Sequence, residues 1–315
     1  MLRFILRRLA FFAPILLGVS LVVFTIMHLT PGDPAEIMLG TEATQAQVTQ
    51  FRKNLGLDQP VYIQYLLFLK NALQGDLGRS IRTNNRVTEE ILSRFPATLA
   101  LAASGLLLAI LMGFPLGLVA ALRQNTATDA LASFFALIGF SIPNFWAGLM
   151  LMLLLSIIIP VLPSSGHGTW RHLVLPSLTL AIQVMAVIAR MTRSSMLEVV
   201  RQDYVRTAQA KGIPAVFVLT HHIVRNALIP VVTIAGLYFG LLLGGVVVTE
   251  TVFSYPGIGR MLIDAIRAHD YPLIQGGVLV FGVCICAVNL LVDVLYAFLD
   301  PRIRARYRSG RPGAV

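Results

Sequence analysis

The side chains that most often do chemistry are sparse in this sequence and too scattered to form a recognisable active site. An intramembrane protease needs two acids inside its spans, but only Asp293 lies clearly within an expected span, and Glu250 lies at the edge of another. No G-x-x-x-x-G-K-[ST] phosphate loop occurs, so the chain lacks that means of binding ATP. We therefore expect no catalytic residues, no cofactor bound by this chain, and no enzyme activity.

A metal site is not expected either. The six histidines are spread over different segments: His28, His167, His172, His221, His222 and His269. The adjacent His221 and His222 diverge on a helix, so a solvated or capping role is favoured over metal binding. Cys284 and Cys286 lie two residues apart in an apolar stretch and also point to different faces, which favours buried small apolar side chains over a disulfide.

A basic, amphipathic stretch at 190–229 is the most informative part of the chain, because two long apolar segments flank it. Its apolar residues recur at four-residue spacing and polar residues occupy the other side. The apolar positions are Met196, Val200, Tyr204 and Ala208, with Leu197 and Val205 beside them. The pattern predicts one helix over 196–211, ended by Gly212, with Pro214 opening the next helix. Such a helix fits a water-facing partner or, because it is basic, lipid headgroups.

The surrounding composition is that of an integral membrane protein. The 315 residues are 56% hydrophobic and 13% charged, whereas soluble domains carry roughly 25% charged residues. The apolar blocks are longer than the ~18 residues that suit a bilayer. We expect an all-α fold with six transmembrane helices at 9–29, 97–122, 131–159, 173–189, 230–249 and 275–299, the fourth being the weakest.

Charge distribution predicts how these spans are oriented. If the N-terminus is cytoplasmic, the segments outside the spans that face the cytoplasm hold 15 Lys and Arg residues and 4 acidic residues. The segments that face outward hold 10 Lys and Arg residues and 10 acidic residues. Positive charge gathers on the cytoplasmic side of a cell membrane. We therefore expect a multi-pass membrane protein with both termini in the cytoplasm. The high pI of 10.2 reports this topology, and no nucleic-acid partner is needed to explain it.

We expect three regions along the chain. Residues 1–30 form the N-terminal cytoplasmic end and first span, 31–96 form an extracytoplasmic loop region, and 97–315 form a core with the other five spans. Within the loop, 62–73 has helical periodicity. An outer segment at 250–276 has strong turn signals and a short expected helix at 261–268; packing across the mouth of a cavity and an ordinary packed loop are both open interpretations.

The sequence DYVRTAQAKGIPAVFVLTHHIVRNALIPVV closely resembles the cytoplasmic coupling loop, or EAA loop, of bacterial ABC-importer permeases. With Gly212 as the fixed point, Arg206, Thr207 and Ala208 occupy the Glu-Ala-Ala positions, and only Ala208 matches the general pattern. The form seen here is similar to that of the dipeptide and oligopeptide importers, in the first permease of the pair. The resemblance extends over nearly the whole chain, through MLRFILRRLA, PGDP, LGLDQP, GDLGRS and the Ser141-Ile142-Pro143-Asn144-Phe145 segment.

The resemblance implies a type I ABC importer permease fold and a set of partners. These are a second homologous permease subunit, two ATP-binding subunits that hold ATP and Mg, an extracytoplasmic solute-binding protein, and the lipid bilayer. It also implies that the coupling helix contacts the ATPase. The residues it assigns to that contact are Asp203, Tyr204, Arg206, Thr207, Ala208, Lys211 and Gly212.

The expected function is ATP-driven, binding-protein-dependent import of di- or oligopeptides. One alternative keeps the importer and changes the cargo to nickel chelates, glutathione or another peptide-like solute. Another, from a different class, is a stand-alone secondary transporter, which the few intramembrane charges disfavour. Candidates for the translocation path or gate are Ser141, Pro143, Asn144, Glu250 and Asp293. For Asp293, a position near the inner membrane interface without a transport role is favoured over a role in the path.

Overall fold

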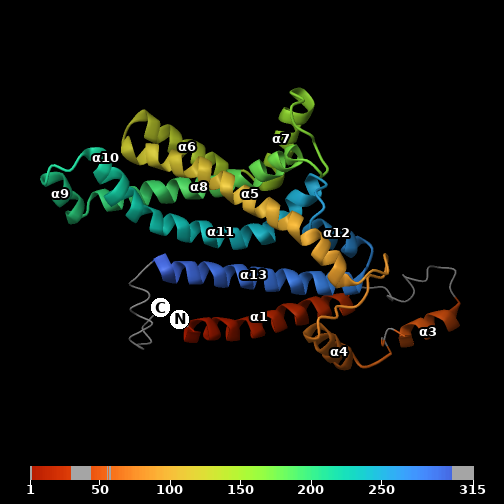
Figure 1. Cartoon of the computed structure of the whole chain (residues 1–315). Coiled ribbons are helices and arrows are strands. Elements are labelled where there is room, and N and C mark those ends of the chain that lie inside the picture. Colours follow the sequence, from red (N-terminus) through yellow and green to blue (C-terminus); the bar gives the residue numbers. More distant parts are fainter. Residues whose placement is uncertain (1, 30–43, 55, 57, 300–315) are drawn as a thin grey trace. The chain divides into compact units, whose positions relative to one another are not determined.

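Helices make up most of the chain, as its apolar blocks predict. The computed structural model describes residues 2–29, 44–54, 56 and 58–299 (Figure 1). In chain order the elements are α1 (Leu2–Leu29), α3 (Gln45–Asn54), α4 (Val61–Leu73), α5 (Val87–Leu122), α6 (Ala127–Ser141), α7 (Asn144–Met152), the π-helical η1 (Leu153–Ile158), α8 (Trp170–Val200), α9 (Asp203–Ala210), α10 (Ala215–Phe217), the π-helical η2 (Val218–Val224), α11 (Arg225–Val252), α12 (Ile258–Arg267) and α13 (Tyr271–Leu299). The helices expected at 62–73 and 261–268 are confirmed as α4 and α12.

In the part of the chain that the structure describes, five helices are long and apolar enough to cross a membrane, and a bent pair of helices makes a sixth if it is counted as one span. The five are carried by α1, α5, α8, the α10–α11 region and α13, and the bent pair is α6 with α7–η1. Large apolar side chains are exposed on these helices, among them Val22 and Ile26 of α1 and Phe135 of α6. Exposed apolar surface of this extent suits lipid contact, which agrees with the expected all-α membrane fold.

The third expected span is not one continuous helix, so that part of the sequence prediction is wrong. α6 ends at Ser141 and α7 begins at Asn144, and the two directions differ by 102°. Ile142 and Pro143 have extended backbone angles (φ −78°, ψ 125° and φ −62°, ψ 136°). The cause is local: a proline disfavours helical angles at the residue before it and donates no N–H to the helix.

The single helix expected over 196–211 is also wrong. α8 continues to Val200, and a new helix, α9, begins at Asp203. Between them Gln202 is extended, with ψ 146°. The four-residue apolar spacing persists through the break because α8 and α9 pack on the same cluster, so periodicity alone does not reveal where one helix stops.

The chain divides into two compact units. One contains Leu99–Tyr255 together with 287–299, and the other contains Leu2–Thr98 together with Pro256–Cys286. The two units therefore meet near residue 98 of the sequence, and Pro256–Cys286 groups with the N-terminal residues.

In the first unit, α8 is the central helix and packs against α6, α7 and α11 (Figure 1). α5 also approaches it closely: a Cβ added to Gly117 would lie 2.3 Å from the carbonyl oxygen of Ala189. The Ser104 and Ser177 hydroxyls lie 2.6 Å apart across the same contact. Small residues and hydroxyl pairs of this kind bring membrane helices together. Two of the polar residues that make the fourth span the weakest by sequence, Ser177 and Thr179, are buried within the unit.

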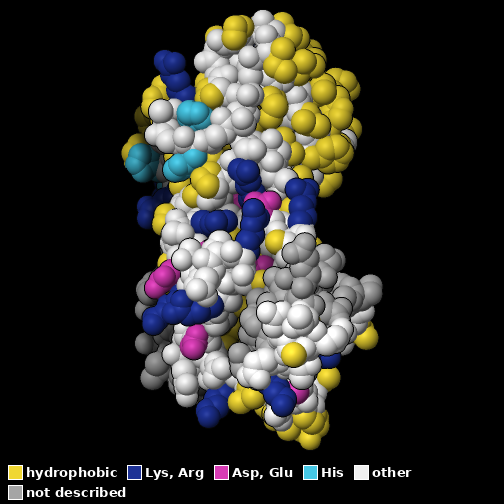
Figure 2. Space-filling model, turned by 90° about the vertical axis from the view of Figure 1, so that its right-hand side faces the viewer, with side chains coloured by type: hydrophobic (Ala, Val, Ile, Leu, Met, Phe, Trp, Pro, Cys, Tyr) yellow, Lys and Arg dark blue, Asp and Glu magenta, His cyan; other side chains and the backbone are white. Residues whose placement is uncertain are grey.

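The second unit has its own apolar core, formed by residues from α1, α5, α12, α13 and the turn before α5. A buried carboxylate holds the loop between α4 and α5. Asp270 accepts hydrogen bonds from the Ser80 hydroxyl (2.5 Å) and the Arg82 backbone N–H (3.4 Å). Figure 2 shows a patch of apolar side chains at the upper right of the view, whereas Lys and Arg side chains are scattered over the rest of that face.

Candidate functional site

α9 is a short helix with well-defined ends. Asp203 lies in its first turn, where a negative charge interacts favourably with the helix dipole. At the other end Gly212 has φ +74°, and its N–H bonds to the Gln209 carbonyl (2.9 Å) while the Ile213 N–H bonds to the Ala208 carbonyl (3.3 Å). These two bonds form a Schellman motif. The ending that the sequence assigned to Gly212 is therefore confirmed.

The inner face of α9 is anchored in an apolar cluster. Val205 and Ala208 are buried there. The other buried members come from α8, η2 and α11: Met196, Val218, Ile223 and Ala227. Ala208 is only 5% exposed because it packs into this cluster. It therefore anchors α9, and the outer surface of the helix is formed by other side chains.

Tyr204 connects α9 to the start of α11. Its ring is 43% exposed, and its hydroxyl accepts a hydrogen bond from the Asn226 amide (3.0 Å). The same amide donates to the His222 carbonyl (2.8 Å). Sequence reasoning did not single out Asn226, although this residue lies in the quoted coupling-loop segment. Its position one helical turn after His222 was the sequence feature that could have indicated this hydrogen bond.

The outer face of α9 and the adjoining α10 combine apolar and charged side chains. The exposed polar residues of α9 and its C-terminal end are Asp203, Arg206, Thr207, Gln209 and Lys211. Beside them Val216 is 74% exposed and Phe217 is 47% exposed. The Phe217 ring stacks on the His221 ring at 4.0 Å. An aromatic centre with a charged rim is typical of a surface that binds another protein.

An ion pair holds the neighbouring helices α6 and α8 together. The Arg193 guanidinium donates two hydrogen bonds to the Asp129 carboxylate, at 2.6 and 2.8 Å, and the Asn125 N–H donates a third at 3.0 Å. Asp129 is buried. Sequence reasoning treated both residues only as loop charges. The sequence nevertheless contains a feature that indicates this pair: Asp129 and Arg193 have opposite charges and lie at the same end of two consecutive expected spans.

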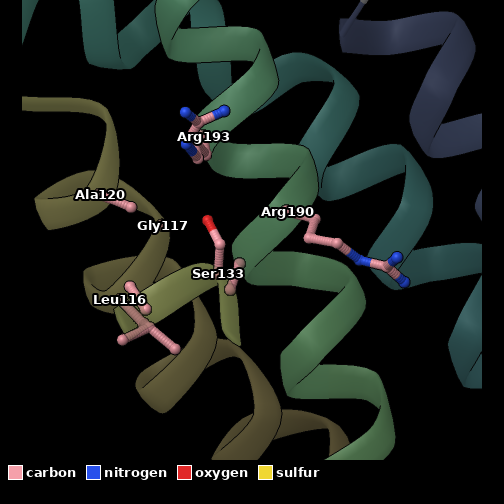
Figure 3. A pocket seen from close by; sticks show the side chains of 8 residues that line it. Leu116, Gly117, Ala120, Ser133, Arg190 and Arg193 are labelled. Atoms are coloured by element: carbon pink, nitrogen blue, oxygen red, sulfur yellow. The ribbon is translucent and has the colours of Figure 1, made fainter. Parts of the chain in front are cut away.

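A small pocket lies beside this ion pair. Its lining comes from α5, α6 and α8 and consists of Leu116, Gly117, Ala120, Ala132, Ser133, Ala189, Arg190 and Arg193. Figure 3 shows that Arg190 and Arg193 leave α8 in different directions, with Arg190 extending away from Ser133 and Leu116. The pocket is mostly apolar, and its two cations have different surroundings.

The proposed path residues do not form one cluster among the described side chains. Ser141 and Pro143 are exposed and Asn144 is half-buried, all at the break between α6 and α7. Glu250 is fully buried near the end of α11, where its carbonyl accepts the Tyr255 N–H (2.8 Å). Burial, aided by the Glu250 charge, raises the pKa of the Tyr255 phenol. Asp293 lies in α13, and its side chain is outside the described residues.

Among the described residues, no group of three or more His, Cys, Asp or Glu side chains is placed to hold a metal ion. His221 is exposed and stacked on Phe217, and His222 offers its carbonyl to Asn226. Cys286 is buried and Cys284 is half-buried, and both are free thiols. The site therefore consists of a surface and its anchoring contacts.

Comparisons with known proteins agree with this architecture. Residues 113–305 match the family model of the binding-protein-dependent transport system inner membrane component, and residues 1–102 match the model of the N-terminal part of such membrane components. The chain is 45% identical over 304 residues to the glutathione transport system permease protein GsiC of Salmonella paratyphi A (strain ATCC 9150 / SARB42), covering 96% of this chain and 99% of that protein. The GsiC protein of Escherichia coli (strain K12) is 44% identical with the same coverage.

Solved structures show the same fold at lower sequence identity. The MetNI methionine ABC transporter in an inward-facing conformation matches with a TM-score of 0.58 and 16% identity, covering 67% of this chain and 96% of that chain. An amino acid ABC transporter crystallised with histidines matches with a TM-score of 0.55 and 17% identity, covering 66% of this chain and 94% of that chain. The chain belongs to the family of binding-protein-dependent transport system inner membrane components, the membrane permeases of ABC importers, and is not an enzyme.

Proposed function

We propose that this chain is the permease subunit of an ATP-driven importer of glutathione or a closely similar small peptide, and that α9 transmits the motion of a separate ATPase. The cargo is supported by the match to glutathione permeases over nearly the whole chain. The coupling role rests on one observation: an exposed helix whose inner face is locked into the end of α8 and the start of α11.

A rigidly anchored helix is suited to transmitting force. Val205 and Ala208 pack inward and the Tyr204 hydroxyl bonds to Asn226, so a displacement of α9 carries η2 and α11 with it. The exposed Arg206 and Lys211 supply the charged rim of the contact, and the rings of Tyr204 and Phe217 supply its apolar part. Closure of the ATPase on nucleotide would then move the permease helices between inward- and outward-open states.

The complete importer in this proposal contains several subunits. A second homologous permease completes the path, two ATP-binding subunits hold ATP and Mg, and an extracytoplasmic binding protein delivers the solute. Both termini and α9 lie on the cytoplasmic side. The outer segments 31–96 and 250–276 then face the binding protein and the outer mouth of the path.

Di- and oligopeptides are the second candidate cargo. The coupling-loop sequence resembles that of peptide-importer permeases, and glutathione is itself a tripeptide with two carboxylates. Selectivity in such a system resides largely in the binding protein, so the cargo is decided by the assembled importer.

The test is reconstitution of the chain with its neighbouring permease, ATPase and binding-protein subunits in proteoliposomes. We expect ATP-dependent uptake of labelled glutathione, with a dipeptide and a nickel chelate measured in parallel. Glutathione uptake by the chain alone without nucleotide would contradict the proposal, and ATP-dependent uptake of the dipeptide alone would move the cargo to peptides.

The α9 contact is tested by a charge reversal with a matched control. Arg206→Glu combined with Lys211→Glu should reduce co-purification of the ATPase by roughly tenfold or more, because both charges lie on the exposed face. Arg267→Glu, on the exposed side of α12, should leave co-purification unchanged. Equal effects of the two changes would remove the coupling role from α9.

A further inference from the structure

Arg190 has no carboxylate partner among the residues that the structure describes, although it lies within a helix that is apolar enough to cross a membrane. Its neighbour Arg193, one turn away, is held by Asp129. Arg190 is exposed, and its guanidinium carbon lies 4.6 Å from the centre of the Phe140 ring. The two arginines therefore have different surroundings, and among the described residues only Arg193 is paired with a carboxylate.

The Arg190 side chain points along α8 toward the interior of the span. α6 and α8 run antiparallel, since Arg193 contacts Asp129 at one end and the Gln183 amide donates to the Phe140 carbonyl (3.4 Å) farther along. Phe140 is eleven residues beyond Asp129, which corresponds to roughly 16 Å along a helix. The guanidinium over Phe140 thus reaches away from Asp129, in the direction in which helical side chains lean, and not toward the nearer end of the helix.

Arg190 belongs to a polar strip on a helix that is otherwise largely buried. Gln183, Arg190, Ser194 and Glu198 are spaced by seven, four and four residues, which places them on one face of α8. Arg190, Ser194 and Glu198 are exposed, whereas Ala189, Thr192 and Ser195 between them are buried. Charged groups at membrane depth face water-filled cavities or partners because exposure to lipid is costly. Arg190, Ser194 and Glu198 therefore form an exposed polar strip on the C-terminal part of α8, and Gln183 on the same face is half-buried and bonded to Phe140.

We propose that Arg190 binds a carboxylate of the transported solute inside the translocation path. This inference rests on the proposed function, because it needs a solute that carries a carboxylate. A planar guanidinium can form two parallel hydrogen bonds to a carboxylate, and the Phe140 ring orients the guanidinium through a cation–π contact. The Gln183 amide holds the Phe140 carbonyl just before the break between α6 and α7.

The first experiment is a substrate-and-residue cycle in the reconstituted importer. We expect Arg190→Gln to lower the initial uptake of glutathione at subsaturating concentration by roughly tenfold or more, which is the effect of losing a charge-assisted pair. Uptake of glutathione diethyl ester, whose carboxylates are both blocked, should change by less than about twofold relative to the unsubstituted importer. The preference of the binding protein for either compound cancels, because each compound is compared between two permeases.

Arg171→Gln is the matched control. Arg171 is exposed near the start of the same helix and also stands over an aromatic ring, that of Trp170, at 5.7 Å. Its substitution should leave uptake of both compounds unchanged. If Arg190→Gln slows both compounds equally, Arg190 does not recognise the solute carboxylate and the inference is wrong. It is also wrong if the substitution separates the two permease subunits, because Arg190 then pairs with the second subunit.

The second experiment does not depend on which solute is imported. In the Arg190→Cys variant, a cationic methanethiosulfonate should modify the introduced thiol in the assembled complex, detected by mass, and should restore uptake at least in part; the anionic reagent should not restore it. The unsubstituted importer, with its native Cys284 and Cys286, reports background labelling. Absence of labelling at residue 190 would overturn the inference, whereas labelling at that position in an importer that moves neither glutathione nor peptide would overturn the proposed cargo alone.

Discussion

At the residue scale, Gly212 shows how a single backbone conformation defines a functional element. Its φ of +74° is in the left-handed region, and a Cβ added there would meet no heavy atom within 4 Å. The constraint is therefore conformational and not one of space. A non-glycine residue in this conformation costs roughly 1–2 kcal/mol, less for Asn, whose side chain can hydrogen-bond locally. The Schellman bonds from Gly212 and Ile213 depend on this conformation.

We expect Gly212→Val to lower ATP-driven uptake strongly while the amount of protein in the membrane stays the same, because the strain loosens the end of α9 without touching the apolar spans. Gly212→Asn should retain most of the uptake, since Asn tolerates the left-handed region. Membrane content is measured by immunoblot and uptake in the same vesicles. Similar activity of the Val and Asn variants would show that the backbone conformation at residue 212 is unimportant for coupling.

At the element scale, the break between α8 and α9 separates a packed helix from a short helix with an exposed outer face. α8 packs against α5, α6, α7 and α11 within the unit, and α9 presents the exposed surface. The ion pair between Asp129 and Arg193 ties α6 to α8 seven residues before α8 ends at Val200. Removing one partner of a buried, hydrogen-bonded ion pair leaves the charge of the other desolvated and without its hydrogen-bond partner, which destabilises the folded state.

We expect Asp129→Asn to reduce the stability of the purified subunit by about 1–3 kcal/mol, the value of charge-assisted hydrogen bonds at a partly buried site. Thermal unfolding in detergent measures this change, and the double variant with Arg193→Gln should lose less than the sum of the two single changes. Arg123→Gln, an exposed residue of the same turn, is the control. Strictly additive losses would contradict direct coupling between Asp129 and Arg193.

At the scale of the whole molecule, the distribution of charge and the family together predict which side each loop faces. The family places the chain in the inner membrane as a multi-pass permease. The excess of Lys and Arg in alternate loops predicts that both termini and α9 lie inside. Asn85 and Gln209, both exposed, lie in loops that this topology puts on opposite sides.

A cysteine at position 85 should react with a membrane-impermeant maleimide in intact cells, because its loop faces outward. A cysteine at position 209 should react only after the membrane is permeabilised. The unsubstituted protein, in which Cys286 is buried and Cys284 is half-buried, gives the background. The reverse pattern would invert the proposed topology and move α9 away from any cytoplasmic ATPase.

The candidate site could be predicted only in part from the chain itself. The ending at Gly212 and the amphipathic character of α9 follow from local chemistry, because the left-handed conformation and the helical period are properties of neighbouring residues. The pairing of Asp129 with Arg193 joins residues 64 positions apart. The hydrogen bond between Tyr204 and Asn226 joins residues 22 positions apart. Neither distance carries a periodic signal that a single sequence can reveal.

By itself, the sequence determined that this is a helical membrane protein, roughly where its spans lie, and which loop resembles the coupling loop of ABC-importer permeases. Long apolar blocks and charge asymmetry report the solvent around a segment, and the bilayer imposes both. Only the tertiary structure decided that the third span bends at Ile142–Pro143, that α9 separates from α8, and that Arg190 stands over Phe140 without a described carboxylate. These features depend on which helices meet, and packing between distant segments settles that choice.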